Sequence, residues 1–130
     1  MAKRPMISIV DDDESVREAT MSLMRAAGFS PEAFQSGNDF LKSERCGHTD
    51  CLIADVQMPG MSGLEMHGRI VQSGNDIPTV LITAYPDDKT RARALKAGIV
   101  CYLTKPFNDQ ELLDCIQLAL AQGATRSKSS

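Results

Sequence analysis

Three carboxylates stand where they could act together. Asp11 and Asp12 directly follow the short apolar segment 6–10, and Asp55 directly follows the apolar segment 51–54. Two unit charges about 4 Å apart repel by about 4 kcal/mol at an effective dielectric of about 20. A hard divalent cation removes that repulsion, because Mg²⁺ binds carboxylate, water and phosphate oxygens. If folding brings these side chains together, we expect them to form a site for Mg²⁺ or Mn²⁺.

A hydroxyl and an ammonium group follow two further apolar segments. Thr83 follows segment 78–82, and Lys105 comes shortly after segment 99–103. A carboxylate nucleophile such as Asp55 can form an acyl phosphate, and phosphoryl transfer depends on positioning and on neutralisation of charge by a metal ion or a lysine. The whole set is far more specific than an acidic run alone, because acidic residues commonly cap a following helix.

Stretches with helical periodicity separate the apolar segments. The predicted strands are 6–10, 31–34, 51–54, 78–82 and 99–103, and the predicted helices are 16–27, a short one at 36–41, 64–73, 87–97 and 108–123. Strands that alternate with helices predict a mostly parallel sheet with helices on both faces. In the doubly wound order 2-1-3-4-5 the first and third strands are neighbours, so the three carboxylates would meet at their carboxyl ends.

Length and composition limit the class of protein. The chain has 130 residues, of which 42% are hydrophobic and 24% charged, as is typical of one globular domain. We expect this domain to span 1–123 and expect 124–130, which has no apolar residue beyond alanine, to be a flexible tail or the start of a linker. The formal net charge of −3 argues against direct nucleic-acid binding by this segment.

Targeting and cysteine patterns favour a cytoplasmic protein. The sequence has no run of about 18 apolar residues and no secretory signal, so we expect no membrane span. None of the cysteine spacings is typical of a metal site, and we expect reduced structural thiols at Cys46, Cys51, Cys101 and Cys115.

Four stretches resemble the receiver domain of bacterial two-component response regulators. They are Ile9-Val10-Asp11-Asp12, Asp55-Val56-Gln57-Met58-Pro59-Gly60-Met61-Ser62-Gly63, Ile82-Thr83-Ala84 and Tyr102-Leu103-Thr104-Lys105-Pro106-Phe107, in that family's order. The resemblance covers residues 6 to about 122. It implies a flavodoxin-like α/β fold, a doubly wound five-stranded parallel sheet in the order 2-1-3-4-5.

The resemblance also implies a phosphoacceptor and a metal site. Asp55 would accept the phosphoryl group. Asp11, Asp12 and Asp55 would hold Mg²⁺ or Mn²⁺, together with the backbone carbonyl of Gln57, and no other cofactor is implied.

A switch is implied by the same resemblance. Lys105 would pair with the phosphoryl group, and the Thr83 hydroxyl would hydrogen-bond to it. Tyr102 matches the family's switch aromatic, which turns inward when Thr83 moves. The phosphoryl group adds charge and acceptor oxygens, to which these side chains can respond.

The implied function is signalling and not metabolic catalysis. A sensor histidine kinase, a phosphotransfer protein or a small phosphodonor would phosphorylate the domain, which would then control a partner or an output domain. The responding face would comprise the helix 87–97, the strand 99–103 and the last helix. We hold two interpretations of the charges there open, a homodimer or partner interface and a solvated surface; the charged residues are Lys89, Arg91, Arg93, Lys96, Asp109, Glu111 and Asp114.

Two alternatives share parts of the pattern. A flavodoxin-like protein that binds FMN needs a phosphate-binding loop rich in Ser, Thr and Gly after the first strand, whereas this loop is triply acidic. A phosphatase that works through an aspartyl phosphate would use Asp11 as nucleophile and Asp13 as general acid. That reading leaves Asp55 and the Met-Pro-Gly loop after it without a role.

Overall fold

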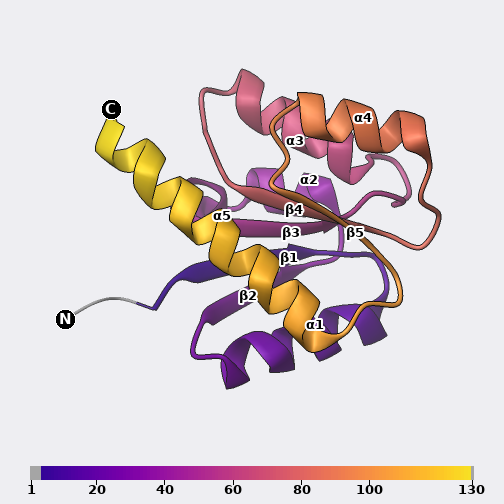
Figure 1. The fold of residues 1–130 in the computed structure, drawn as a ribbon, viewed down its shortest axis with the longest axis horizontal. Coiled ribbons are helices and arrows are strands. Elements are labelled where there is room, and N and C mark those ends of the chain that lie inside the picture. Colours follow the sequence, from indigo (N-terminus) through magenta and orange to yellow (C-terminus); the bar gives the residue numbers. More distant parts are fainter. Residues whose placement is uncertain (1–3, 130) are drawn as a thin grey trace.

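Strands and helices alternate along the chain, as the periodicity predicts. The computed structural model describes residues 4–129 (Figure 1). The elements are β1 Met6–Val10, α1 Glu14–Ala26, β2 Ser30–Phe34, α2 Gly37–Lys42, the 3₁₀ helix η1 Glu44–His48, β3 Cys51–Asp55, α3 Gly63–Gln72, β4 Thr79–Thr83, α4 Asp88–Lys96, β5 Cys101–Thr104 and α5 Asp109–Ser129. Of these, η1 is the one element without a counterpart in the sequence prediction.

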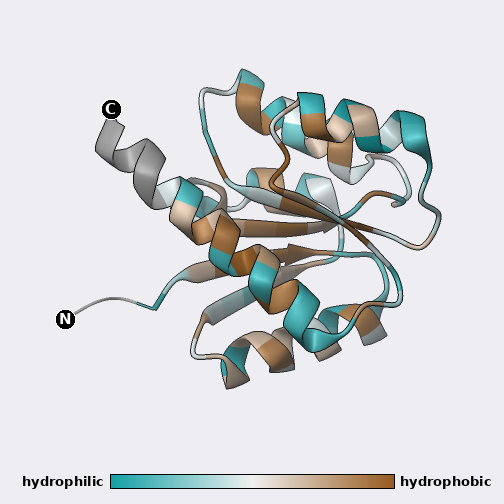
Figure 2. Ribbon diagram, in the orientation of Figure 1, coloured by the Kyte–Doolittle hydropathy of each residue, from teal (hydrophilic) through white to brown (hydrophobic). Residues whose placement is uncertain are grey.

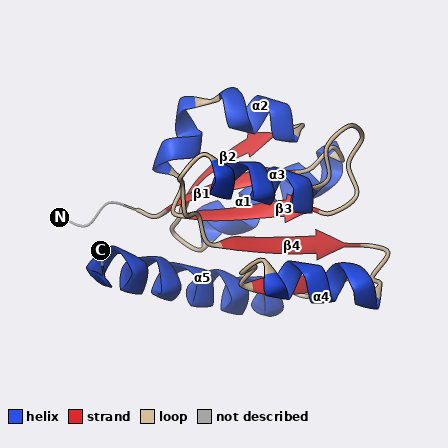
Figure 3. Ribbon diagram, turned by 90° about the horizontal axis from the view of Figure 1, so that it is seen from above, coloured by secondary structure: helices blue, strands red, loops and turns tan. Residues whose placement is uncertain are grey.

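The five strands form one parallel sheet in the order β2-β1-β3-β4-β5. The predicted fold class is therefore confirmed. β1 and β3 lie side by side, with Val10 level with Ala54. The residues that follow these two strands therefore emerge at the same edge of the sheet. Figure 3 shows β1, β3 and β4 running in the same direction between the helices.

Side chains that alternate along the strands build two separate cores. One face of the sheet carries Ile7, Ile9 and Ile53, which pack with Met24 of α1 and Ile116 of α5. Leu52 and the side chains on the opposite face pack with Phe40 of α2 and Met66 of α3. A parallel sheet is covered on both faces, so its central strands β1, β3 and β4 are largely apolar and appear brown over much of their length in Figure 2, whereas the edge strand β2 is more polar.

Local hydrogen bonds fix where the helices begin. Asp13 caps α1 through Oδ1, which accepts the backbone N–H groups of Ser15 and Val16. Asn108 followed three residues later by Glu111 is a sequence pattern typical of a capping box, and the structure forms it before α5: the side chain of Asn108 accepts the N–H of Glu111, and the Glu111 carboxylate accepts the N–H of Asn108. These two caps fix the starts of α1 and α5 and therefore limit the length of the loops that precede them.

One predicted helix end is wrong. Gly123 was expected to terminate the last helix, but α5 continues to Ser129. Gly28 and Gly98, which follow α1 and α4, have φ values of +91° and +93° that end a helix, whereas Gly123 is not among the glycines with positive φ. Its small size serves packing instead, since a Cβ there would lie 3.2 Å from Pro78 Cγ.

Cysteines and helix composition were also the subject of expectations. All four cysteines are free thiols. Burial raises the pKa of Cys51 to about 12, so that thiol stays protonated. Among residues 4–129, no helix is both long and apolar enough to cross a membrane.

Gly63 lets the start of α3 approach the end of β3. A Cβ on this residue would lie 2.5 Å from the backbone oxygen of Asp55 and 3.0 Å from Leu81 Cδ2. The first contact is with backbone, which cannot rotate away as a flexible side chain can. The tight approach holds the strand end that carries Asp55.

We predict that Gly63→Ala lowers the free energy of unfolding by about 1–3 kcal/mol, the usual cost of overpacking. Gly68→Ala is the matched control, because Gly68 lies in the same helix with open space around its Cα. That change should raise the free energy of unfolding by about 0.5–1 kcal/mol. Urea unfolding followed by circular dichroism measures both. Equal effects of the two substitutions would contradict the role given to Gly63.

Candidate functional site

Backbone hydrogen bonds continue past the strand ends and hold the site residues in place. The N–H of Asp11 donates to the carbonyl of Phe34 at 3.2 Å, and the N–H of Lys105 donates to the carbonyl of Thr83 at 2.8 Å. Asp55 is the last residue of β3. The sheet itself therefore determines where these side chains start.

The three acidic side chains converge as the strand order predicts. Carboxylate oxygens of Asp11, Asp12 and Asp55 lie within 4.8 Å of one another. Asp11 is 3% and Asp55 7% exposed, whereas Asp12 is exposed to solvent. The cluster is therefore buried on the sheet side and open on the Asp12 side.

Among the described residues, one ammonium group pairs with these carboxylates and offsets part of their negative charge. Lys105 Nζ donates to Asp55 Oδ2 at 2.8 Å and lies 3.6 Å from Asp11 Oδ2. The side chain of Lys105 is 22% exposed, so solvent screens these pairs only in part. Three carboxylates and one ammonium leave a local excess of negative charge.

Short-range hydrogen bonds orient the two buried carboxylates. The N–H of Asp13 donates to Asp11 Oδ1, and the N–H of Gln57 donates to Asp55 Oδ1, each at 2.9 Å. Each carboxylate thus has one oxygen held by the backbone two residues on, and its second oxygen turned to Lys105.

Burial and charge shift two pKa values at this site. Burial is the largest influence on Asp11 and raises the pKa of its carboxyl, against the lowering effects of the Asp13 N–H and of Lys105. Burial alone would lower the pKa of Lys105, but its hydrogen bond to Asp55 and the charges of Asp11 and Asp55 outweigh this and raise it. The site therefore favours the charged form of Lys105 and disfavours the charged form of Asp11.

The donor set fits a hard divalent cation. Three carboxylates within reach of one centre are oxygen ligands of the kind that Mg²⁺ and Ca²⁺ take, and no softer ligand is part of the cluster. The raised pKa of Asp11 shows that its charge lacks full compensation. A cation bound by Asp11, Asp12 and Asp55 would supply it.

The predicted switch residues make no hydrogen bond to the acidic cluster among the described residues. The buried Thr83 hydroxyl donates to the side-chain oxygen of Gln57 at 2.6 Å and accepts the N–H of Tyr85 at 2.9 Å. The Tyr102 ring packs against the core beneath α4, where its hydroxyl is buried without a hydrogen-bond partner among the described residues. Thr83 and Tyr102 thus flank the site without contributing to it in this state.

Two contacts were not found by sequence reasoning. The Arg17 guanidinium donates to the backbone carbonyl of Asp11 at 2.7 Å, which ties α1 to the acidic loop. The prediction for Gln57 concerned its backbone carbonyl, whereas its side chain binds Thr83. For Gln57 the one available signal was its position two residues after Asp55.

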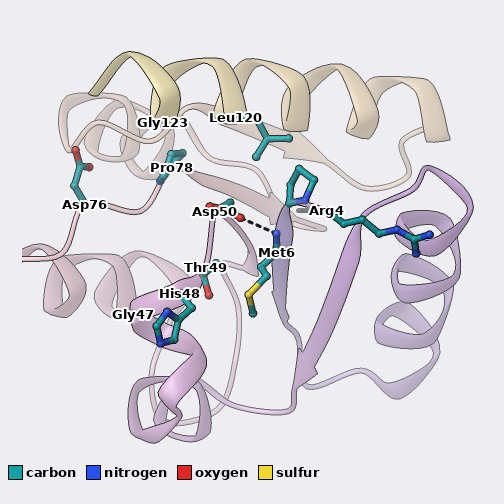
Figure 4. Close-up of a pocket in the computed structure, with 11 residues that line it drawn as sticks. Arg4, Met6, Gly47, His48, Thr49, Asp50, Asp76, Pro78, Leu120 and Gly123 are labelled. Atoms are coloured by element: carbon teal, nitrogen blue, oxygen red, sulfur yellow. Dashed lines mark hydrogen bonds between the residues drawn. The ribbon is translucent and has the colours of Figure 1, made fainter. Parts of the chain in front are cut away.

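A second hollow lies at the opposite edge of the sheet. Its volume is about 870 Å³, and it opens between the start of β1, the segment before β3 and the end of α5 (Figure 4). Asp50 there accepts the N–H of Met6 at 2.8 Å. This hollow shares no residue with the acidic cluster, which stands at the other end of the strands.

Comparison with known proteins agrees with this geometry. The sequence model of the response regulator receiver domain matches residues 7–117. The chain belongs to the response regulator receiver domain family. Membership makes it a receiver module of two-component signalling and disfavours both the phosphatase and the FMN-binding alternatives.

Individual relatives support the same assignment. The chain is 43% identical over 115 residues to the response regulator protein TodT of Pseudomonas putida, covering 88% of this chain and 51% of TodT. It is 36% identical over 126 residues to nodulation protein W of Bradyrhizobium diazoefficiens, covering 97% and 56%. The structure of the response regulator StyR matches with a TM-score of 0.90 and 42% identity, covering 98% of this chain and 64% of StyR. The receiver domain thus spans about half the length of these curated relatives.

We predict that Asp11→Asn raises the free energy of unfolding of the metal-free protein at pH 7, by about 1 kcal/mol. Asparagine can still accept the Asp13 N–H but carries no charge. Because the pKa of Asp11 is raised in the folded state, the wild type loses stability as pH rises above the unfolded pKa of 3.8, and regains it as pH falls. The gain from Asp11→Asn should therefore vanish below pH 3.8.

Urea unfolding in EDTA at several pH values measures this effect. Adding Mg²⁺ should stabilise the wild type more than Asp11→Asn, because a ligand that binds only the folded state shifts unfolding by mass action. Asp39→Asn is a control, since Asp39 is an exposed acid in α2, and it should show neither the pH dependence nor the Mg²⁺ difference. A destabilised Asp11→Asn in EDTA at pH 7 would contradict the electrostatic account.

Proposed function

We propose that Asp55 accepts a phosphoryl group from a sensor histidine kinase, a phosphotransfer protein or a small phosphodonor. The observation that carries this proposal is the Asp55 carboxylate itself: it ends β3, pairs with Lys105 at 2.8 Å and stands within 4.8 Å of two further carboxylates. A nucleophile, a counter-cation and a cation-binding pair thus share one small, partly open site.

The chemistry follows from these positions. An oxygen of Asp55 attacks phosphorus, and the bond from phosphorus to the donor's leaving group breaks as the acyl phosphate forms. Lys105 stays close to the new phosphoryl oxygens and balances part of their charge. Because Asp12 is exposed, the acidic cluster is open to solvent on that side, and a phosphodonor can approach Asp55 from there.

We propose that Mg²⁺, or Mn²⁺ in its place, occupies the acidic cluster. Asp11, Asp12 and Asp55 would hold it, with the backbone carbonyl of Gln57 as a further oxygen ligand. Bound there, the cation neutralises negative charge between the carboxylates and the phosphoryl oxygens. The excess negative charge of the cluster supports this assignment over a metal-free site.

The phosphorylated state is proposed to reach a surface through three residues. The Thr83 hydroxyl and Lys105 bind phosphoryl oxygens, and Tyr102 couples the movement of Thr83 to β5. The responding surface comprises α4, β5 and α5, and it would contact a partner, an output domain or a second copy of the chain. α4 carries cations and the start of α5 carries acids, which suits a charge-complementary homodimer.

The remaining assignments follow from family membership and composition. The chain acts as a phosphorylatable signalling domain whose chemistry is limited to its own phosphorylation and dephosphorylation. We place it in the cytoplasm of a bacterial cell, where it contacts proteins and neither nucleic acid nor membrane. The receiver module is taken to span 1–123, and 124–130 to be a flexible tail or the start of a linker.

We predict that incubation with acetyl phosphate and Mg²⁺ adds one phosphoryl group, seen as a mass increase of about 80 Da, and that Asp55→Asn abolishes it. Asp13→Asn is the matched control, because Asp13 is an acid at the same edge that caps α1, and asparagine caps a helix equally well. Its labelling should match the wild type. Labelling that persists in Asp55→Asn would assign the acceptor to another residue.

We predict that Thr83→Ala still binds beryllofluoride, a phosphoryl mimic, but transmits a weaker response to α4. Lys105→Ala should weaken both, because it removes a full charge and not only a hydroxyl. Backbone ¹H–¹⁵N chemical shifts with and without beryllofluoride and Mg²⁺ measure the response. Thr104→Ala is the control, since Thr104 is an exposed threonine paired with Thr83 across the sheet.

Changes that run from Thr83 through Tyr102 to α4 in the wild type and in Thr104→Ala support the switch. Changes confined to the loops around Asp55, or a full response in Lys105→Ala, would contradict it.

A further inference from the structure

The hydroxyl of Thr83 is already engaged before any phosphoryl group is present. It lies 2.6 Å from the side-chain oxygen Oε1 of Gln57 and 2.9 Å from the backbone nitrogen of Tyr85. Gln57 is exposed, whereas Thr83 is 0% exposed. The Gln57 side chain therefore reaches from the loop after β3 to a buried group at the end of β4.

The Thr83 hydroxyl can donate only one hydrogen bond at a time. A threonine hydroxyl has one proton, and an amide oxygen can only accept. The bond between Thr83 and Gln57 uses that proton, and the bond from Tyr85 N–H occupies a lone pair. Phosphoryl oxygens are also acceptors only, so Thr83 cannot donate to one of them while it donates to the Gln57 oxygen.

Gln57 contacts the phosphoacceptor as well as the threonine. Its backbone N–H donates to Asp55 Oδ1 at 2.9 Å, while its side chain accepts from Thr83. One residue thus joins the end of β3 to the end of β4 across the site. A chemical change at Asp55 acts on the residue that holds Thr83.

We propose that the side chain of Gln57 is a latch that holds Thr83 in the unphosphorylated arrangement. This inference rests on the proposed function and deepens it. Gln57 acts through Thr83 as a positioning residue and sets the threshold of the switch. Each switching event in which Thr83 turns to the phosphoryl group must break the bond that Thr83 donates to Gln57, and the apparent affinity for the phosphoryl group is lowered accordingly.

Gln57→Met tests the latch, because methionine has a similar length but lacks the amide oxygen. The bond that is lost is a single hydrogen bond, so beryllofluoride should bind the variant roughly two- to tenfold more tightly at saturating Mg²⁺. Titration followed by ¹H–¹⁵N NMR measures the dissociation constant. The Tyr85 amide, which donates to Thr83, is the local reporter.

The effect of Gln57→Met is then measured in two further backgrounds. In Thr83→Ser the hydroxyl remains, so the effect should be retained. In Thr83→Ala no hydroxyl is left to be held, so the effect should disappear. This cycle separates a latch on Thr83 from any influence of Gln57 on solvent access or on the metal ion.

A second readout needs no phosphoryl mimic or metal. Three-bond NMR scalar couplings, measured on the protein in EDTA, report the χ1 angle of Thr83. The wild type should show one rotamer, and Gln57→Met should show more averaging among rotamers, because the Thr83 side chain loses one of the two partners that orient it and keeps only the Tyr85 N–H.

The outcomes are distinct. Tighter binding in the wild-type and Thr83→Ser backgrounds but not in Thr83→Ala, with averaged couplings, supports the latch. An equal effect in Thr83→Ala, or unchanged affinity and couplings in Gln57→Met, overturns it while leaving phosphorylation of Asp55 standing. If beryllofluoride does not bind the wild type, the proposed function fails, and the couplings alone decide on the latch.

Discussion

Mutual repulsion among three carboxylates is the constraint on which the site depends. Asp11, Asp12 and Asp55 lie within 4.8 Å of one another, and Lys105 alone is paired with them among the described residues. The fold imposes this cost because β1 and β3 are neighbours in the sheet and both end at the same edge. The same imbalance makes the site attractive to a divalent cation. Metal binding and metal-free stability are therefore opposed here, and the pKa of Asp11, raised chiefly by burial and to a lesser degree by the charges of Asp55 and Asp12, is consistent with that opposition.

The apolar architecture holds this unfavourable cluster in place. Backbone hydrogen bonds extend the sheet to Asp11 and Lys105, and the close approach of Gly63 confines the carbonyl of Asp55. Two cores, one on each face, make the strands rigid. Because the strand ends cannot separate, the carboxylates cannot relieve their repulsion by moving apart, and they remain positioned for a ligand.

Neutral hydrogen-bonding groups, and not charges, determine the energetics around Thr83 and Tyr102. Thr83 has its one proton committed to Gln57, while the buried Tyr102 hydroxyl has no partner among the described residues. An unsatisfied buried polar group costs about 1–3 kcal/mol. A rearrangement that frees Thr83 and gives the Tyr102 hydroxyl a partner would therefore break one hydrogen bond and remove one unsatisfied polar group at the same time. Such local bonds, and not the strands, are the part of the domain in which the proposed switch would act.

The sequence by itself determined the order of the elements, the strand ends that carry Asp11, Asp55, Thr83 and Lys105, and the helix caps at Asp13 and Asn108. These follow from periodicity and from bonds between residues two to four positions apart, which are local properties of the chain. The convergence of the carboxylates was predictable as well, because few topologies are open to alternating strands and helices.

Only the tertiary structure decided what Gly123 and Gln57 do. Gly123 is typical of a helix end, but α5 continues past it, and the lack of a side chain there fits its close approach to Pro78, a residue far away in the sequence. The bond between Gln57 and Thr83 spans 26 positions and depends on the path of a loop and on one rotamer. Sequence patterns carry no information on such a pairing, because its energy arises only after the two strand ends have been brought together.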